Sequence, residues 1–95
     1  MIRSVATVRF RAGTTDAQVD AFTDALLALE IDGMTARSCG RDLGLRDTAV
    51  DYAIVLDFED EAAYRRYDDD ADHVRLRSGL AAEIVDSGSI CQFEV

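Results

Sequence analysis

The side chains with the most chemical potential in this sequence surround its single histidine, His73. Tyr67 precedes it, and Asp70 between them has the residue type and position of a helix N-cap, which would place His73 in the first turn of a helix. Residues at helical spacing after His73 are apolar: Leu76, Leu80 and Ile84. The imidazole is therefore predicted to head an apolar stripe that faces the protein interior.

A histidine and a tyrosine in this arrangement suit general acid–base catalysis. A neutral imidazole can take a proton from an acidic carbon, and a tyrosine hydroxyl can donate a hydrogen bond to the enolate or carbonyl oxygen that results. We interpret His73 and Tyr67 as the candidate catalytic residues. The alternative is a structural imidazole that hydrogen-bonds and packs under a sheet, so the sequence leaves open whether the protein is an enzyme.

Four more residues are candidate substrate contacts. Ser4 shares the parity of Ala6, Val8 and Phe10 and should look into the same space as His73. Tyr52, Tyr64 and Phe22 are aromatic residues on expected core-facing positions; alternatively they are ordinary core side chains, the two tyrosines with their hydroxyls satisfied. In a protein without a cavity, the space would be filled by Phe22, Leu26, Leu76 and Phe58.

A cluster of aspartates at positions 68, 69, 70 and 72 lies beside His73 and raises the question of a metal. The spacing does not fit a calcium-binding loop, and transition-metal sites usually use more than one imidazole. We interpret the cluster as a solvated helix break and predict no metal. No phosphate-binding glycine loop or nucleophile elbow occurs, so no cofactor is predicted.

The elements that must position these residues follow from periodicity. Thr15 and Gln18 have the form of a capping box at the start of the first helix. Asp60 caps a second helix, which the aspartate cluster separates from the His73 helix. The expected strands and helices are 2–11 (strand), 15–29 (helix), 34–41 (strand), 50–58 (strand), 60–67 (helix), 70–84 (helix) and 89–95 (strand).

This order, β-α-β-β-α-β with a split second helix, predicts an α+β ferredoxin-like fold: an antiparallel sheet in strand order 4-1-3-2 with the helices on one face. On the other face, arginines of the first strand would lie beside aspartates of the third, with small apolar residues between them. Such a face favours a second sheet as its partner, hence a homodimer; a solvated face with ordinary ion pairs is the alternative.

The same strand order would put Cys39 and Cys91 on opposite edges of the sheet, about 14 Å apart, which is too far for a disulfide within one chain. Two cysteines make neither a disulfide framework nor a metal quartet. We interpret both as small buried thiols.

Length and charge limit the function. The 95 residues suit a single domain covering 1–95, without a signal peptide or an apolar run long enough to span a membrane, so a cytoplasmic protein is expected. The formal charge of −9 disfavours partners with negative surfaces. Neither nucleic acid nor membrane binding is predicted.

Five segments together resemble the stress-responsive A/B barrel (Dabb) family: 1–14 (MIRSVATVRFRAGT), 40–44 (GRDLG), 51–55 (DYAIV), 64–67 with 73–74 (YRRY and HV), and 91–95 (CQFEV). The resemblance implies a dimeric α+β barrel in which the sheets of two subunits pack face to face. Its enzymatic members resemble polyketide cyclases, whose cavity histidine and tyrosine correspond to His73 and Tyr67. Ser4 stands where those cyclases have a second histidine.

We therefore expect a small-molecule-binding homodimer with an internal cavity for an apolar, carbonyl-containing ligand, acting as a cyclase-like or isomerase-like enzyme. Two alternatives remain: a non-catalytic binding or assembly module, and a cofactor-independent monooxygenase. An enzyme should have a cavity beside His73 with a volume on the order of several hundred Å³, as known ligand pockets have.

Overall fold

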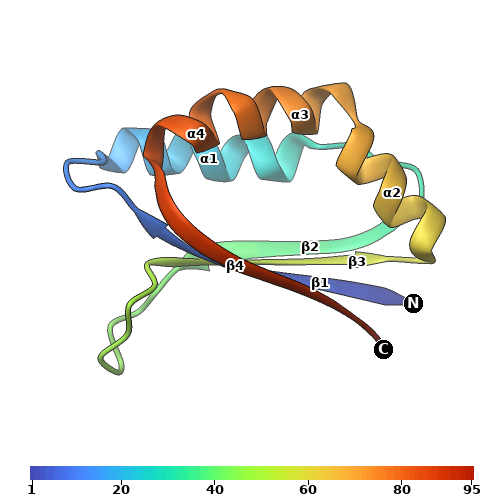
Figure 1. Ribbon diagram of the computed structural model, residues 1–95, viewed down its shortest axis with the longest axis horizontal. Coiled ribbons are helices and arrows are strands. Elements are labelled where there is room, and N and C mark those ends of the chain that lie inside the picture. Colours follow the sequence, from blue (N-terminus) through green and yellow to red (C-terminus); the bar gives the residue numbers. More distant parts are fainter.

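The computed structural model describes residues 1–95 and has four strands and four helices in two layers (Figure 1). Its elements are β1 (Ile2–Phe10), α1 (Asp16–Ala28), β2 (Met34–Arg41), β3 (Tyr52–Phe58), α2 (Glu61–Asp69), α3 (Ala71–Ser78), α4 (Leu80–Ile84) and β4 (Val85–Glu94). None of the helices is long and apolar enough to cross a membrane.

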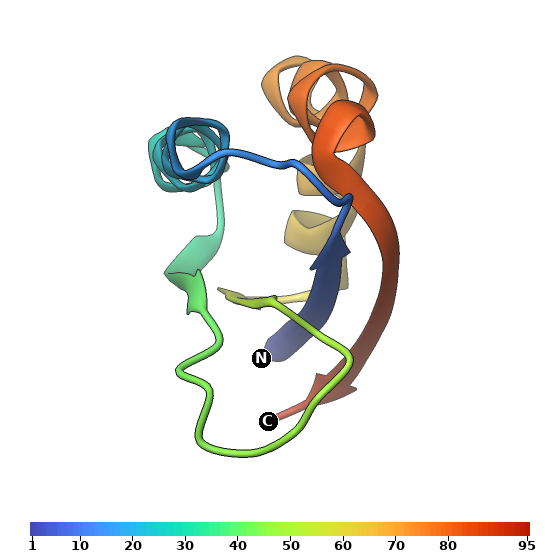
Figure 2. The same ribbon diagram turned by 90° about the vertical axis from the view of Figure 1, so that its left-hand side faces the viewer.

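The sheet is antiparallel, with strand order β2-β3-β1-β4, so the ferredoxin-like prediction is confirmed. All helices cover one face, and Figure 2 shows α1 and the α2–α4 row side by side above it. The loop between β2 and β3 projects from the opposite side of the sheet (Figure 1). The second face of the sheet therefore carries no helix.

Local signals account for the helix starts. Thr15 accepts a hydrogen bond from the Gln18 amide at 3.1 Å, and the Gln18 side chain accepts from the Thr15 amide at 2.9 Å, which confirms the capping box. Asp60 caps α2 through the Ala63 amide. At the turn before β2, Gly33 has a φ of +88°, and a Cβ there would lie 2.6 Å from the Ala63 Cβ.

The core lies between the sheet and the helices. Both layers contribute apolar side chains to it, chiefly α1 from the helices and β3 from the sheet. The buried apolar residues are Val8, Val19, Phe22, Leu26, Leu29, Tyr52, Leu56, Phe58, Ala63, Tyr67, Leu76 and Ile84. Tyr52, Phe58 and Ile84 are the largest fully buried side chains. The predicted inward parities of β1 and β3 are thus confirmed.

Beyond shifts of one or two residues at the ends of other elements, two features differ from the prediction. The last strand begins at Val85 instead of residue 89, because Gly88 continues the ladder: it pairs with Val8, and a Cβ at this position would lie 3.0 Å from the Thr7 carbonyl oxygen. The predicted final helix is divided at Gly79 into α3 and α4. In both places a glycine lets its backbone lie close to a carbonyl oxygen of another residue, and hydrophobic periodicity in the sequence does not indicate such a contact.

The cysteines lie on opposite edge strands and form no disulfide, as predicted. Their expected burial was wrong: Cys39 is half-buried and Cys91 is exposed. Cys91 pairs with Val5, so its side chain shares the helix-free face of the sheet with that valine.

Candidate active site

The position of His73 depends on how α2 passes into α3. Asp70 ends α2, where its amide donates to the Tyr67 carbonyl at 3.2 Å, and it also caps α3 by accepting from the amides of Asp72 (3.0 Å) and His73 (3.2 Å). The predicted N-cap is therefore confirmed. This tight junction stacks the His73 ring on the Tyr67 ring, with centroids 3.9 Å apart and planes inclined by 25°.

Aromatic side chains support Tyr67 from below. Its ring lies 5.3 Å from the centroid of Phe58 and 6.0 Å from that of Tyr64, and Phe58 and Tyr64 meet edge to face at 5.5 Å. Because Phe58 is completely buried in β3, it fixes the Tyr67–His73 stack relative to the sheet.

A cavity of about 180 Å³ lies beside this stack, between the helices and the sheet. Apart from His73, Tyr67 and Arg77, its walls are formed by apolar residues; the lining residues are Ala6, Val8, Phe22, Leu26, Ile54, Tyr67, His73, Leu76, Arg77, Ala81, Val85 and Ile90. Ile90 is 61% exposed, so the cavity opens toward β4. Its volume is below the several hundred Å³ expected for an enzyme of this type.

The His73 ring carries a buried nitrogen without a protein partner. Nδ1 is the one buried side-chain nitrogen or oxygen of the chain that makes no hydrogen bond. Burial, followed by the positive charge of Arg77, lowers the pKa of His73; the nearby carbonyls of Tyr67 and Asp68 act in the opposite direction without prevailing. The imidazole is therefore mainly neutral at pH 7, and one of its two ring nitrogens then carries a lone pair.

Tyr67 stays protonated over the physiological range. Burial raises the pKa of its hydroxyl to about 12, with a smaller contribution from Tyr64 and Asp68. This hydroxyl makes no hydrogen bond to the protein and is not among the fully buried unpaired atoms, so it reaches solvent. The Tyr67 hydroxyl can therefore act as a neutral hydrogen-bond donor, but it is a poor general acid at pH 7.

Lowering the pH is expected to destabilise the fold through His73. Because the pKa of His73 is lower in the folded chain, the unfolded chain takes up the proton first as the pH falls through about 6.5. The contribution is present in full above that pH and is lost as the pH falls toward the folded pKa. Urea midpoints at pH 7.5 and 5.5 should therefore fall further for the wild type than for His73→Gln; an equal fall in both proteins would contradict the assignment.

Three of the predicted site residues come together and three do not. His73, Tyr67 and Phe22 line the cavity, whereas Ser4, Tyr52 and Tyr64 lie outside it. Ser4 is on the expected face and is buried, but it pairs with Leu56 and Gln92 further along the strand, and its Oγ accepts from Gln92 Nε2 at 3.3 Å. The expectation that it looks into the same space as His73 is not met.

The two outlying tyrosines have structural partners. The Tyr52 hydroxyl is 2.5 Å from the Thr23 hydroxyl, and burial raises the pKa of Tyr52 to about 12. Tyr64 packs on Phe58 and borders a separate surface hollow next to Ile2 and Gln92. Both match the alternative interpretation of core aromatics.

Arg77 is a cavity residue that the sequence analysis missed. It lies four residues after His73 on the same side of α3, and its Nη1 donates to Asp68 Oδ1 at 3.1 Å. The four-residue spacing from His73 could have indicated this position, but charged residues on short helices usually face solvent.

The aspartate cluster is engaged in capping and ion pairs. Asp70 caps α3, Asp68 pairs with Arg77, and Asp72 pairs with Arg75. No three histidine, cysteine, aspartate or glutamate side chains converge as a metal site would require.

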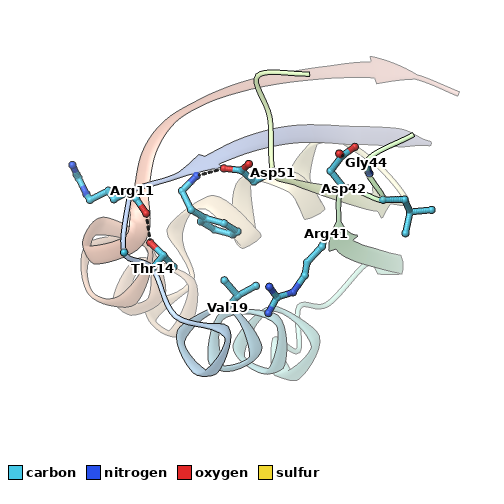
Figure 3. A pocket seen from close by; sticks show the side chains of 10 residues that line it. Arg11, Thr14, Val19, Arg41, Asp42, Gly44 and Asp51 are labelled. Atoms are coloured by element: carbon cyan, nitrogen blue, oxygen red, sulfur yellow. Dashed lines mark hydrogen bonds between the residues drawn. The ribbon is translucent and has the colours of Figure 1, made fainter. Parts of the chain in front are cut away.

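A larger hollow of about 480 Å³ lies between the start of α1 and the β2–β3 loop (Figure 3). Its polar groups have partners within the protein: Asp51 accepts from the Phe10 amide, Thr14 donates to the Arg11 carbonyl, and Arg41 donates to the carboxylates of Asp16 and Asp20 on α1. It contains no histidine, tyrosine or cysteine, so the smaller cavity at His73 is the candidate active site.

Comparison with known proteins agrees with this geometry. The model of the stress responsive A/B barrel domain matches residues 2–95. The chain belongs to the Dabb family. No curated protein matches its sequence.

Solved structures similar to this Dabb protein cover almost all of it. A dimeric ferredoxin-like protein of unknown function from Thermobifida fusca is 30% identical, with a TM-score of 0.91 over 99% of this chain and 90% of that one. A Dabb family protein from Mesorhizobium loti is 20% identical, with a TM-score of 0.80 over 99% and 95% of the two chains. A hydroxynitrile lyase from Passiflora edulis is 14% identical, with a TM-score of 0.87 over 99% and 92%. The last two likenesses concern the fold alone.

Proposed function

We propose that this Dabb protein is a homodimer that binds a small, apolar, carbonyl-containing compound in the His73 cavity and transfers a proton on it. The observation that carries the proposal is the neutral imidazole of His73, stacked on Tyr67, in the wall of a largely apolar cavity.

The site supports one chemical step in particular. The neutral imidazole of His73 accepts a proton from a carbon next to the ligand's carbonyl group, which leaves an enolate. The Tyr67 hydroxyl, which has no protein partner, donates a hydrogen bond to the carbonyl oxygen as negative charge develops there. The imidazolium then returns the proton to carbon, and a cyclase, lyase or isomerase would each build on this step.

A complete polyketide-cyclase reaction has less support than this proton transfer. Ser4 replaces the second histidine of the cyclases and is hydrogen-bonded to Gln92 outside the cavity. The cavity also has room for a group of limited size: an apolar cavity of about 150 Å³ binds benzene, and this one measures about 180 Å³. A longer substrate would extend past Ile90 into solvent.

The experiment is the exchange of α-protons of phenylacetone in D₂O, followed by proton NMR with and without the protein. Faster exchange with the protein supports the proposal. Binding of phenylacetone without faster exchange would favour a non-catalytic binding module. Oxygen consumption with an electron-rich quinol would instead favour the monooxygenase alternative.

The helix-free face of the sheet supports the dimer. Val5 and Val55 pair across β1 and β3 and are half-buried, with Ser38 and Cys91 next to them on the edge strands. Beside this row, Arg3 donates to both oxygens of Asp57 at 2.8 and 3.0 Å, as the charge pattern predicted. Small side chains and a neutralised ion pair suit close packing against a second sheet. The similar protein from Thermobifida fusca is described as dimeric.

Placing a charge in the centre of this face should separate the subunits. We expect the wild type to sediment at twice the 10.4 kDa chain mass and Val55→Glu to sediment as a single chain, because the glutamate would be buried without a partner. Val74→Glu, at an exposed position in the helical layer, is the matched control and should remain dimeric. A wild type that sediments as one chain at micromolar concentration would contradict the dimer.

A further inference from the structure

Arg77 gives the His73 cavity a chemical preference that the proposed proton transfer does not require. It is the one lining residue that is charged at pH 7, because the imidazole is neutral and the remaining walls are apolar. Residues four apart on a helix have Cβ atoms about 5–6 Å from each other, and the charge of Arg77 is close enough to lower the pKa of His73, so both side chains border the same space.

The guanidinium has donors to spare. Of its five N–H groups, only one from Nη1 is used, in the 3.1 Å hydrogen bond to Asp68. Both side chains of this pair are about half exposed, at 52% and 53%. Such single, solvated ion pairs contribute little to stability, so an incoming anion can share or replace Asp68 at small cost.

Resting on the function proposed above, we propose that the ligand of this cavity is an oxo acid, whose carboxylate binds Arg77 while its carbonyl group faces His73 and Tyr67. A planar guanidinium matches a carboxylate through two parallel hydrogen bonds, which a neutral ester or amide cannot form equally well. The short separation on α3 places the carboxylate a few bonds from the reacting carbon. The ligand's size is that of one ring or a short aliphatic chain.

The overall charge of the protein makes this preference measurable. At a formal charge of −9 the protein repels anions at long range, so any preference for a carboxylate must come from a local cation. Removing the charge of Arg77 should therefore abolish the preference or turn it toward the neutral compound. Arg75 provides a matched control, since it lies on the same helix, pairs with Asp72 and does not line the cavity.

The test compares phenylacetate with phenylacetamide, which have nearly the same shape, by isothermal titration calorimetry at pH 8, where His73 is neutral. The wild type and Arg75→Gln are expected to bind phenylacetate at least about tenfold more tightly than the amide, as a charged hydrogen-bonded pair allows. Arg77→Gln should lose this preference, and Arg77→Lys should retain part of it. Asp68→Asn, which frees the guanidinium, should bind phenylacetate more tightly than the wild type.

Each remaining result would overturn the proposal. One is an Arg77→Gln variant that keeps the preference for phenylacetate while its urea transition shows that it is folded. The other is a wild type that binds both compounds equally or binds neither. Phenylacetone has no carboxylate, so the exchange of its α-protons tests the proton transfer without the Arg77 contact. If exchange persists while the carboxylate preference is absent, the proton-transfer function stands and the oxo-acid proposal does not.

Discussion

Replacing His73 with glutamine is expected to slow the exchange of phenylacetone α-protons by about 10²–10⁴-fold, the usual contribution of a positioned general base. Glutamine keeps polar atoms near the position of the imidazole but has no basic nitrogen. The exchange rate measured by NMR at pH 8, relative to the rate without protein, gives the effect directly.

The control for a structural role is the free energy of unfolding of the same variant. Nδ1 of His73 makes no hydrogen bond, but the ring stacks on Tyr67, so its removal should lower the unfolding free energy in urea by about 0.5–1.5 kcal/mol, much less than the effect on exchange. Tyr67→Phe should slow exchange less than His73→Gln, because the hydroxyl only stabilises the developing oxygen charge. Exchange that is undiminished in His73→Gln would remove the histidine from the mechanism.

Phe58→Ala is expected to have the largest effect on stability, a loss of about 3–5 kcal/mol. Phe58 is fully buried, and its ring contacts those of Tyr64 and Tyr67, so truncation leaves a cavity at the centre of the core. For a domain of this size each kcal/mol lowers the melting temperature by roughly 4–8 °C. Urea unfolding at one fixed protein concentration measures the loss, because a dimer's stability depends on concentration.

Two variants give this measurement its scale. Leu27→Ala removes an exposed side chain of α1 and should cost no more than about 0.5 kcal/mol. Phe58→Leu keeps most of the volume and should cost about 1 kcal/mol, so it reports on the site if Phe58→Ala does not fold. Because Phe58 supports Tyr67, Phe58→Leu should also weaken ligand binding; unchanged binding would show that the Tyr67–His73 stack does not need it.

The architecture could be predicted because it depends on local periodicity. Alternation along β1 and β3 gave the correct inward faces, the Thr15–Gln18 box gave the start of α1, and Asp70 gave the start of α3. These patterns involve residues only a few positions apart, so they can be recognised directly in the amino-acid sequence.

The site was only partly predictable for the same reason. His73 and Tyr67 belong to adjoining helices, so their proximity follows from a junction of a few residues. Ser4 required more: parity assigns a side chain to a face of the sheet, but the register of β1 against β3 and β4 decides how far along that face it lies. That register places Ser4 beside Gln92, while Ala6 and Val8 reach the cavity.

The sequence by itself therefore determined the element order, the inward faces and the helix that carries His73, and the strand order followed from the usual topology of that element order. Tertiary structure alone decided the extent of β4, the break at Gly79, the exposure of Cys91 and the place of Arg77 on the cavity wall. The physical reason is that these features depend on distances between elements far apart in the chain, which are set when the sheet pairs and the helices pack upon it.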